Sequence, residues 1–557
     1  MLVKMLHIDL LCLAREKETT LEKVRALGAV HIIAGAAESQ TQVELRAKIE
    51  DDLKAIRLVT KLRKECAIDV AKVKLSPLSA KEILDFDEEI SERQERIDDL
   101  SRQIGKYAPY GDFDPELARK VMAKVENLSD YVALPEVLPE KRLSAMEKER
   151  EALLEECAAL QAKIFSADIE KILDGNKNLR QILDFEQAKD AMEKCGEICV
   201  LSGWLPEKRL DGLRESAAKN YWGLLAREAS ADEVPPTLIE PPRFFGPVKA
   251  LFAGLGISPA YTEADVSIPF MCYFTVFFAM LVGDGAYGLI FLAATLWGWK
   301  ATKAKRSVAL RSALVLMTVF SAATVVWGLL SNTWFGAQIP WCNNWPSVKW
   351  LADPSYHNMM LLCFTIGVSH LMIARIWNGI CKINSLGCLA EFGWAGVLLF
   401  MYFVTNSIVG IFKGIPGAMF WVFGVSLACI FMFTLKPCEL KTRGAELGML
   451  PLNIMSALGD IISYVRLFAV GLASVKVAEN FNQMALNIFA GEHNFVVGVV
   501  LALAMAAIMI FGHVLNIVMA GLSILVHAVR LNTLEFSNHK GVTWSGYSYN
   551  PFRKKGE

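Results

Sequence analysis

The 557-residue sequence lacks the short motifs that mark most self-contained catalysts. It contains no GxxxxGK[ST] phosphate loop, no HExxH metal helix and no GxSxG nucleophile turn. It also lacks a CxxC pair: the twelve cysteines are scattered, and Cys195 and Cys199 form only a CxxxC. We therefore expect no nucleotide hydrolysis by this chain itself, no metal site and no cofactor. A disulfide-stapled secreted domain is excluded.

Charged residues are scarce in the second half of the chain. Residues 1–265 carry 39 Lys and Arg against 49 Asp and Glu, whereas residues 266–557 carry only 19 against 10. Apolar residues make up 53% of the whole chain. This composition excludes a purely soluble enzyme, a collagen-like fibre and a disordered protein. The first half is predicted to be an acidic soluble domain large enough to bury a core, and the second a polytopic membrane domain.

The chain begins with the pattern of a β-α-β unit. Residues 2–13 alternate as a strand, residues 15–27 have helical spacing, and Gly28 ends that helix before a β-branched run at 30–33. No small-residue cleavage site follows the apolar residues 1–14, so we predict a first strand rather than a signal peptide. The N-terminal half is accordingly expected to stay in the cytoplasm.

Long helices are predicted between this unit and a returning strand at 198–204, which a helix at 206–219 follows. Their apolar positions recur every three or four residues among dense charge, which is typical of antiparallel coiled-coil arms. A dimerisation coiled coil is the alternative, but several arms within one chain favour an intrachain hairpin. Residues 107–139 contain Gly and Pro and predict a small lobe at the far end. We therefore expect an α+β domain of two small α/β lobes joined by an antiparallel coiled coil.

The expected domain organisation has four parts. A cytoplasmic two-lobe coiled-coil domain covers 1–233, and a Pro-rich joint covers 234–266, beginning with VPPTLIEPP. A transmembrane domain covers 267–535, with two long C-terminal helices, and a basic cytoplasmic tail covers 536–557.

The transmembrane domain is predicted to cross the membrane about eight times. A span needs about 20 residues, and seven apolar stretches qualify: 267–299, 309–335, 357–381, 388–411, 416–435, 450–489 and 495–533. The first stretch is interrupted by Gly283-Asp284-Gly285, so it forms either one long helix or two. The basic loop that holds Lys300 to Arg311 is expected to be cytoplasmic, which requires two crossings before it. Eight spans then leave both termini in the cytoplasm of a multi-pass cell-membrane protein.

The GDGAYG sequence at 283–288 fits the GxGxxG pattern of dinucleotide-binding proteins. That interpretation requires a strand before it and a helix after it in a soluble βαβ unit. The motif instead lies inside an apolar run. A glycine-permitted break that exposes Asp284 to a polar cavity is therefore favoured.

The last two apolar stretches hold the polar residues that are most informative about function. On an ideal helix, four residues of stretch 450–489 share one face, with Arg466 at its edge. Stretch 495–533 places a second set of five on one continuous polar stripe that ends at Arg530. The first set is Ser456, Asp460, Ser463 and Ser474, and the second is His513, Asn516, Ser523, His527 and Arg530.

The two arginines are the main candidates for function. An arginine at the bilayer centre costs about 2.5–3.5 kcal/mol, and Arg466 has long apolar or small-residue runs on both sides. A packing role for Arg466 and snorkelling of Arg530 to the headgroups are the alternatives. His527 could relay protons or only line a hydrated cavity, and Asp460 could pair with another helix or accept protons. Fixed positive charges in a bilayer suit a barrier at which a mobile carboxylate must discharge.

Four sequence stretches resemble the membrane stator subunit of rotary V/A-type ATPases, which is called subunit I in prokaryotes and subunit a in eukaryotes. They are PPRFFGPVKALFAGLGISPAYTEADVSIPF, GDGAYG, ISYVRLFAVGLASVKVAE and GLSILVHAVRLNTLEF. The resemblance covers nearly the whole chain, and the compact loops are similar to the prokaryotic form.

The resemblance implies that Arg466 and Arg530 face the ion-carrying carboxylates of a rotating proteolipid ring. Arg466 would be the essential residue that separates two aqueous half-channels. His527 and Asp284 fall on positions linked to the outer half-channel. The other half-channel candidates are Ser456, Asp460, Ser463, Ser474, His513, Asn516, Ser523 and Glu535. Ser474 and Ala520 depart from eukaryotic forms, which carry His and Glu there, so the ion route differs in detail.

The resemblance also implies partners. They are the proteolipid ring of c or K subunits, peripheral-stalk subunits of the E and G type, a central-stalk base subunit of the C or d type, and the lipid bilayer; no nucleic acid is expected. The chain would be a non-catalytic part of the ATP-driven machine. A stand-alone transporter or channel with a coiled-coil regulatory domain is the alternative, but that class often has two similar halves and no clear internal repeat occurs here. A purely structural scaffold would leave two buried arginines without a use.

Overall fold

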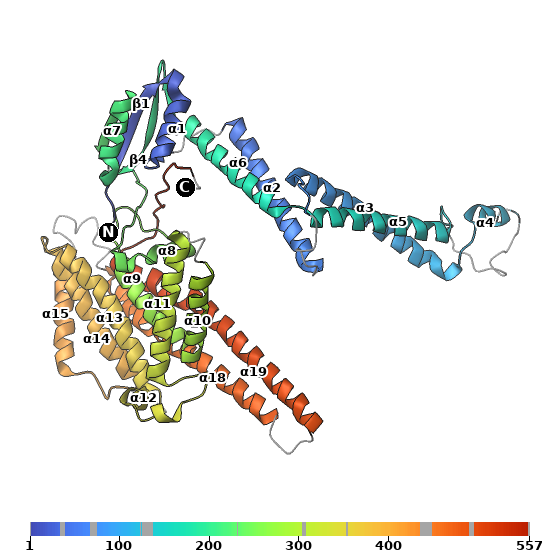
Figure 1. Ribbon diagram of the computed structural model, residues 1–557. Coiled ribbons are helices and arrows are strands. Elements are labelled where there is room, and N and C mark those ends of the chain that lie inside the picture. The colour runs from blue at the N-terminus through green and yellow to red at the C-terminus, as the bar shows by residue number, and fades with distance from the viewer. Residues whose placement is uncertain are drawn as a thin grey trace. The chain divides into compact units, whose positions relative to one another are not determined.

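A computed structural model describes residues 2–33, 39–66, 75–122, 124, 137–230, 232–302, 308–351, 355–434, 448–488 and 495–554 (Figure 1). Contacts divide the chain into two units. The charged unit comprises Leu6–Glu228 and the residues from Asn550 onward, and the apolar unit comprises Met1–Met5 and Ala229–Tyr549. The chain therefore passes between the units three times.

The charged unit contains one small sheet, and every strand among the described residues belongs to it. Its strands are β1 (Met5–Leu13), β2 (His31–Ile32), β3 (Glu193–Cys195), β4 (Ile198–Pro206) and β5 (Gly223–Glu228), in the order β2-β4-β1-β5 with β3 paired to β4. The predicted opening strand, its helix α1 (Lys17–Leu27) and the returning strand all form. They join a single sheet because β4 pairs antiparallel with β2. Helix α7 (Leu210–Asn220) follows β4.

Every second side chain of β1 contributes to the core that packs against this sheet. Successive side chains of a strand point to opposite faces, and Ile8, Leu10 and Cys12 are all buried. They pack in one cluster with Leu21 and Val24 of α1. Helix α1 therefore covers the face of the sheet on which these residues of β1 lie.

Two antiparallel helix pairs extend from the sheet. The helices are α2 (Gln40–Cys66), α3 (Ala80–Tyr107), α4 (Pro115–Met122), α5 (Leu143–Phe165) and α6 (Ile169–Asp190). Helix α2 packs on α6, and α3 packs on α5 (Figure 1). Ion pairs of 3.0 Å from Arg93 to Glu156 and 3.5 Å from Arg96 to Glu149 show that α3 and α5 run antiparallel. The apolar 3–4 spacing thus forms intrachain helix pairs.

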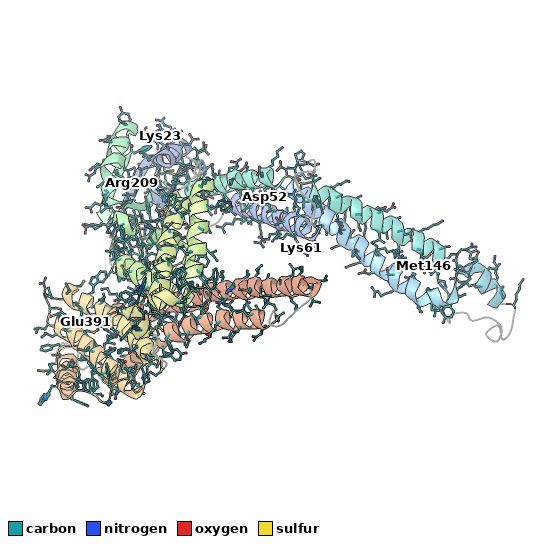
Figure 2. All side chains as sticks on the ribbon, turned by 60° about the horizontal axis from the view of Figure 1, so that its bottom comes forward. Lys23, Asp52, Lys61, Met146, Arg209 and Glu391 are labelled. Carbon is teal, nitrogen blue, oxygen red and sulfur yellow. The ribbon has the colours of Figure 1, made fainter. Side chains whose placement is uncertain are left out.

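Buried apolar side chains continue along the α3–α5 pair toward the predicted distal lobe. Met146, which Figure 2 labels on α5, belongs to one buried cluster with Leu100 and Ile104 of α3. Of residues 107–139, the described ones are helical or irregular and form no strand. Residues 123 and 125–136 lie outside the described residues, so the distal α/β lobe stays a prediction.

The C-terminal segment adds to the core of the charged unit. The Phe552 N–H donates to the Val30 carbonyl at 2.8 Å, and the Asn550 N–H donates to Nδ1 of His31 at 3.0 Å. The Phe552 ring is buried, and the Arg25 guanidinium lies 5.7 Å from the centroid of this ring. The end of the chain is therefore held beside β2 by backbone, ring and cation–π contacts.

The apolar unit is helical throughout its main body. Its helices are α8 (Val248–Leu255), α9 (Ser267–Val282), α10 (Gly285–Ala301), α11 (Val308–Ser331), α12 (Pro346–Leu351), α13 (His357–Cys381), α14 (Gly387–Ile408), α15 (Gly417–Phe433), α17 (Leu450–Ile462), α18 (Val465–Ile488), α19 (Phe495–Ser523) and α20 (Ser537–Lys540). Helices α9, α11, α13 and α14 contribute buried side chains to one large core.

Five helical segments in the described part of the chain are long and apolar enough to cross a membrane, or six if the bent pair α9–α10 counts as one span. The stretch at 267–299 forms two helices with a 119° bend between them, and α15 is a shorter apolar helix. The chain is thus a multi-pass membrane protein, and eight crossings stay a prediction. The loops at 303–307 and 435–447, whose charge predicts the topology, lie outside the described residues.

Close glycine contacts allow α10 and α11 to approach each other. A Cβ placed on Gly328 would lie 2.2 Å from the Gly285 Cα, and one on Gly288 would lie 2.8 Å from the Val325 backbone nitrogen. Small residues that permit close backbone approach are typical of helix packing in membranes.

Gly328→Ala is expected to destabilise the apolar unit by about 1–3 kcal/mol or more, because the added methyl group meets rigid backbone. The measurement is the midpoint of thermal unfolding of the purified protein in detergent. Gly424→Ala on α15 is the matched control, since a Cβ there has no neighbour within 4 Å. Equal midpoints for the two variants would contradict this packing.

Acid is expected to loosen the C-terminal segment. Burial lowers the pKa of His31, and its Nδ1 must be unprotonated to accept from Asn550. Because the folded pKa lies below the unfolded value of about 6.5, stability is full above that value and declines as pH falls toward the folded pKa. Hydrogen exchange of the Asn550 amide, corrected for intrinsic rates, should accelerate between neutral pH and pH about 5. The Tyr549 amide, which donates to the Thr237 carbonyl, is the control; equal acceleration of both would contradict a role of His31.

Candidate functional site

The helical segment that carries Arg466 is interrupted by a turn shortly before this residue. Helix α17 ends at Ile462, two turn residues follow, and α18 begins at Val465. Tyr464 in this turn is fully buried, and its hydroxyl lies 2.8 Å from Nδ1 of His370 on α13. The Nε of Arg466 donates to the Ser463 carbonyl at 2.9 Å. The turn therefore anchors the backbone and gives the guanidinium one fixed partner.

Arg466 and Arg530 share one carboxylate. A guanidinium nitrogen of Arg466 pairs with Oε1 of Glu535, and Nε of Arg530 lies 3.6 Å from the same oxygen. The Glu535 side chain is only 5% exposed, whereas that of Arg530 is 56% exposed. The second carboxylate oxygen, Oε2, is buried and has no hydrogen-bond partner among the described residues. The two predicted arginines therefore come together around an acid that lies behind them.

Two π-helical turns after α19, Ile524–Ala528 and Leu531–Phe536, change the predicted polar stripe. The stripe assumes 100° per residue along 513–530, but a π turn contains more residues than an α turn and shifts the angular register. The uninterrupted stripe is therefore wrong beyond Ser523. The same shift places Glu535 against Arg466.

The first two residues of the stripe, His513 and Asn516, belong to a directed chain of hydrogen bonds. Asn516 donates to the Tyr287 hydroxyl at 3.1 Å, which leaves that hydroxyl to donate to Nδ1 of His513 at 2.8 Å. Nε2 of His513 then donates to Asn482 Oδ1 at 3.1 Å. Ser474 binds Asn516 twice, through its hydroxyl at 3.1 Å and its carbonyl at 2.9 Å. The predicted residues Ser474, His513 and Asn516 thus converge on Tyr287.

Asp284 forms the break between α9 and α10. Its Oδ1 accepts from the Ala286 N–H at 2.8 Å, which makes it the N-cap of α10, and its Oδ2 accepts from the Gly336 N–H at 2.9 Å. The side chain is buried. Gly283 before it has a φ of 70°, which favours glycine. Asp284 therefore joins the bend to the loop after α11.

Asp460 belongs to a second polar cluster, formed with α13, α14 and α20. Arg375 donates to Nδ1 of His539 at 3.1 Å, so Nε2 of that ring carries the proton and donates to Asp460 at 3.0 Å. Arg375 and Lys382 both bind Glu391, at 3.2 Å and 2.6 Å. Figure 2 labels Glu391 in the apolar unit. Four elements are therefore tied together by ion pairs and by the hydrogen bonds of the neutral His539 ring.

Two cavities lie on opposite sides of Arg466 along the α17–α18 segment. One, of about 570 Å³, is lined by residues of α17 up to Asp460, among them Ser456, and by Arg375 and His539. The other, of about 490 Å³, is lined by residues of α18 from Leu467 to Glu479 and by the loop after α11. Arg466 lines neither cavity in the described structure.

The remaining predicted residues are placed as follows. Ser463 contributes its carbonyl to Arg466, and Ser456 lines the larger cavity. His527 has a buried Nδ1 without a hydrogen-bond partner among the described residues. Ser523 ends α19.

Five residues of these networks were not expected from the sequence: Tyr287, Asn482, Arg375, Glu391 and His539. Arg375 and Glu391 had a usable signal, since each is an isolated charge inside an apolar stretch and such charges are usually functional or paired. Tyr287 lies within GDGAYG itself. His539 gave no comparable signal, because it follows the predicted membrane segment and its contacts depend on the second π turn.

Residues 453–554 match the V-type ATPase 116kDa subunit family. The chain is 27% identical to the V-type ATP synthase subunit I of Borreliella burgdorferi and 28% identical to V-type ATP synthase subunit I 1 of Treponema pallidum, and both alignments cover each chain completely. It is 26% identical to the A-type ATP synthase subunit I of Methanocaldococcus jannaschii over 75% of this chain and 63% of that one. The chain is thus similar over its whole length to V-type ATP synthase subunits I, and its residues 453–554 match the related family of 116kDa subunits.

Glu391→Gln is expected to lower the thermal unfolding midpoint of the detergent-purified protein clearly. It leaves Arg375 and Lys382 without their shared anion, and breaking a buried ion pair costs about 3–5 kcal/mol. Asp174→Asn is the control, because its pair with Lys177 is 70% exposed on both sides and such pairs contribute little. An unchanged midpoint for Glu391→Gln would show that the cluster does not hold the helices together.

Proposed function

We propose that this chain is the ion-translocating stator of the membrane sector of a V/A-type rotary ATPase. The observation that carries the proposal is the position of Arg466, a permanent positive charge between two separate cavities of the apolar unit. An arginine cannot lose its proton in a protein, so it repels a passing cation and attracts a carboxylate.

The two cavities are the candidate half-channels. The larger one contains Asp460, Ser456 and His539, and it is also lined by Thr434 and Met449, between which the sequence carries the basic residues Lys436 and Lys441. We therefore assign it to the cytoplasmic side. The smaller one contains Lys476 and Glu479 and lies next to the loop after α11, which we assign to the outside. An ion entering from one side would load a carboxylate of the rotating ring and leave on the other side after one turn past Arg466.

The face of the chain that meets the ring is expected along α19 and the π turns that follow it. Large apolar side chains remain exposed there, including Leu503, Phe511, Leu525 and Leu534. Arg530 is exposed on this same segment. A proteolipid ring of c or K subunits, which carries carboxylates on an apolar surface, would complement both the apolar face and the arginines.

The charged unit is proposed to anchor the stator. Its helix pairs present dense surface charge and suit contacts with peripheral-stalk subunits of the E and G type and a central-stalk base subunit of the C or d type. In this arrangement the chain hydrolyses no nucleotide. The proposed setting is the cell membrane, with both termini cytoplasmic.

Arg466→Gln is expected to reduce ATP-driven ion uptake into vesicles to the background uptake that is measured with an uncoupled complex. The mechanism requires the fixed charge, and glutamine keeps approximate size and hydrogen bonding but not charge. Assembly is measured in parallel by copurification of the ring and stalk subunits. Arg311→Gln, an exposed arginine near the start of α11, is the control and should transport normally.

If the Arg466→Gln complex assembles and transports at nearly the wild-type rate, the arginine is structural and the stator mechanism is wrong. If the chain purifies and transports without a ring or nucleotide-binding subunits, the alternative of a stand-alone transporter is correct instead.

A further inference from the structure

Glu535 is an unusual counterion because it neutralises only half of the charge around it. Its single negative charge serves Arg466 through Oε1, and the same oxygen lies 3.6 Å from Arg530 Nε. A carboxylate can accept several hydrogen bonds, yet its buried Oε2 has no partner among the described residues. The cluster therefore carries one unbalanced positive charge beside an acid whose second oxygen is unused.

The geometry separates an inner side from an outer side of the two arginines. Glu535 is 5% exposed and lies behind them, whereas the Arg530 side chain is 56% exposed and that of Arg466 is 22% exposed. Neighbouring side chains on the same segment, Leu525 and Leu534, are also exposed. A second carboxylate could therefore approach the guanidinium groups from the outside without displacing Glu535 from its place in the fold.

We propose that Glu535 is an exchangeable counterion: it holds Arg466 when no external carboxylate is opposite, and it yields the guanidinium when one arrives. This inference rests on the stator function proposed above, in which the external carboxylate belongs to the ring. Glu535 is a positioning residue, because it acts through Arg466 and does not itself carry the ion.

The physical reason is charge balance. Two cations and one fixed anion leave a net charge of +1, which attracts an incoming carboxylate, while competition from Glu535 keeps the new pair weak enough to separate. An isolated buried ion pair would be too stable to release quickly, since attraction in a low-dielectric site is strong. Sharing Arg466 between two acids shortens the time for which either acid holds it.

A double substitution is expected to restore transport that each single substitution removes. Glu535→Gln raises the net charge to +2 and should trap the ring carboxylate. Arg530→Gln leaves Arg466 and Glu535 as an isolated pair and should withhold Arg466 from the ring. The double variant R530Q/E535Q restores the net charge of +1 and should transport better than either single variant.

The experiment measures ATP-driven ion uptake per assembled complex for the two single variants, the double variant and Glu535→Asp. We expect each single variant to lose about tenfold, because each changes the net charge of the cluster by one unit. The double variant should recover to within about threefold of the wild type, and Glu535→Asp should exceed Glu535→Gln because it retains the charge.

Three results would overturn the counterion role. They are uptake by Glu535→Gln within about twofold of wild type, a double variant no better than the poorer single variant, and failure of every Glu535 variant to assemble while Arg530→Gln assembles normally. Arg466→Gln is measured in the same series. If it still transports, the stator proposal fails; if it does not transport and the double variant shows no recovery, only the role of Glu535 fails.

Discussion

A permanent positive charge inside an apolar helix bundle is the constraint on which the rest of the apolar unit depends. Arg466 cannot be neutralised by deprotonation, so its surroundings must supply partners. The chain does so by breaking the helix before it, which presents the Ser463 carbonyl, and by distorting the helix after α19, which presents Glu535. Two departures from regular helix geometry thus accommodate one residue.

The two polar networks on either side of Arg466 differ from each other in the kind of groups that they use. His513, Asn516 and Tyr287 use neutral groups in one directed chain, whereas Arg375, Glu391 and Lys382 alternate charges. Burying neutral polar groups costs less desolvation than burying charges, and removing one partner of a buried charge pair is especially costly. The two ends of the bundle therefore differ in how strongly they respond to the loss of a single group.

Much of this arrangement could be predicted from the sequence. The opening strand and helix, the helix pairs, the apolar segments and Arg466 follow from period and composition, because each depends on neighbours close in the chain. The pairing of Arg466 with Glu535 could not be predicted, since an ideal helical wheel gives the wrong register once π turns intervene. Tyr287 and Asn516 are 229 residues apart, and their contact depends on tertiary packing.

The three passages of the chain between its two units have a mechanical consequence. A domain attached by one linker can swivel about that linker, because rotation about single bonds costs little. Three covalent connections, after Met5, Glu228 and Tyr549, would have to wind around one another for the units to turn by large angles. Three covalent connections therefore limit how far one unit can rotate against the other, whatever the stiffness of each linker.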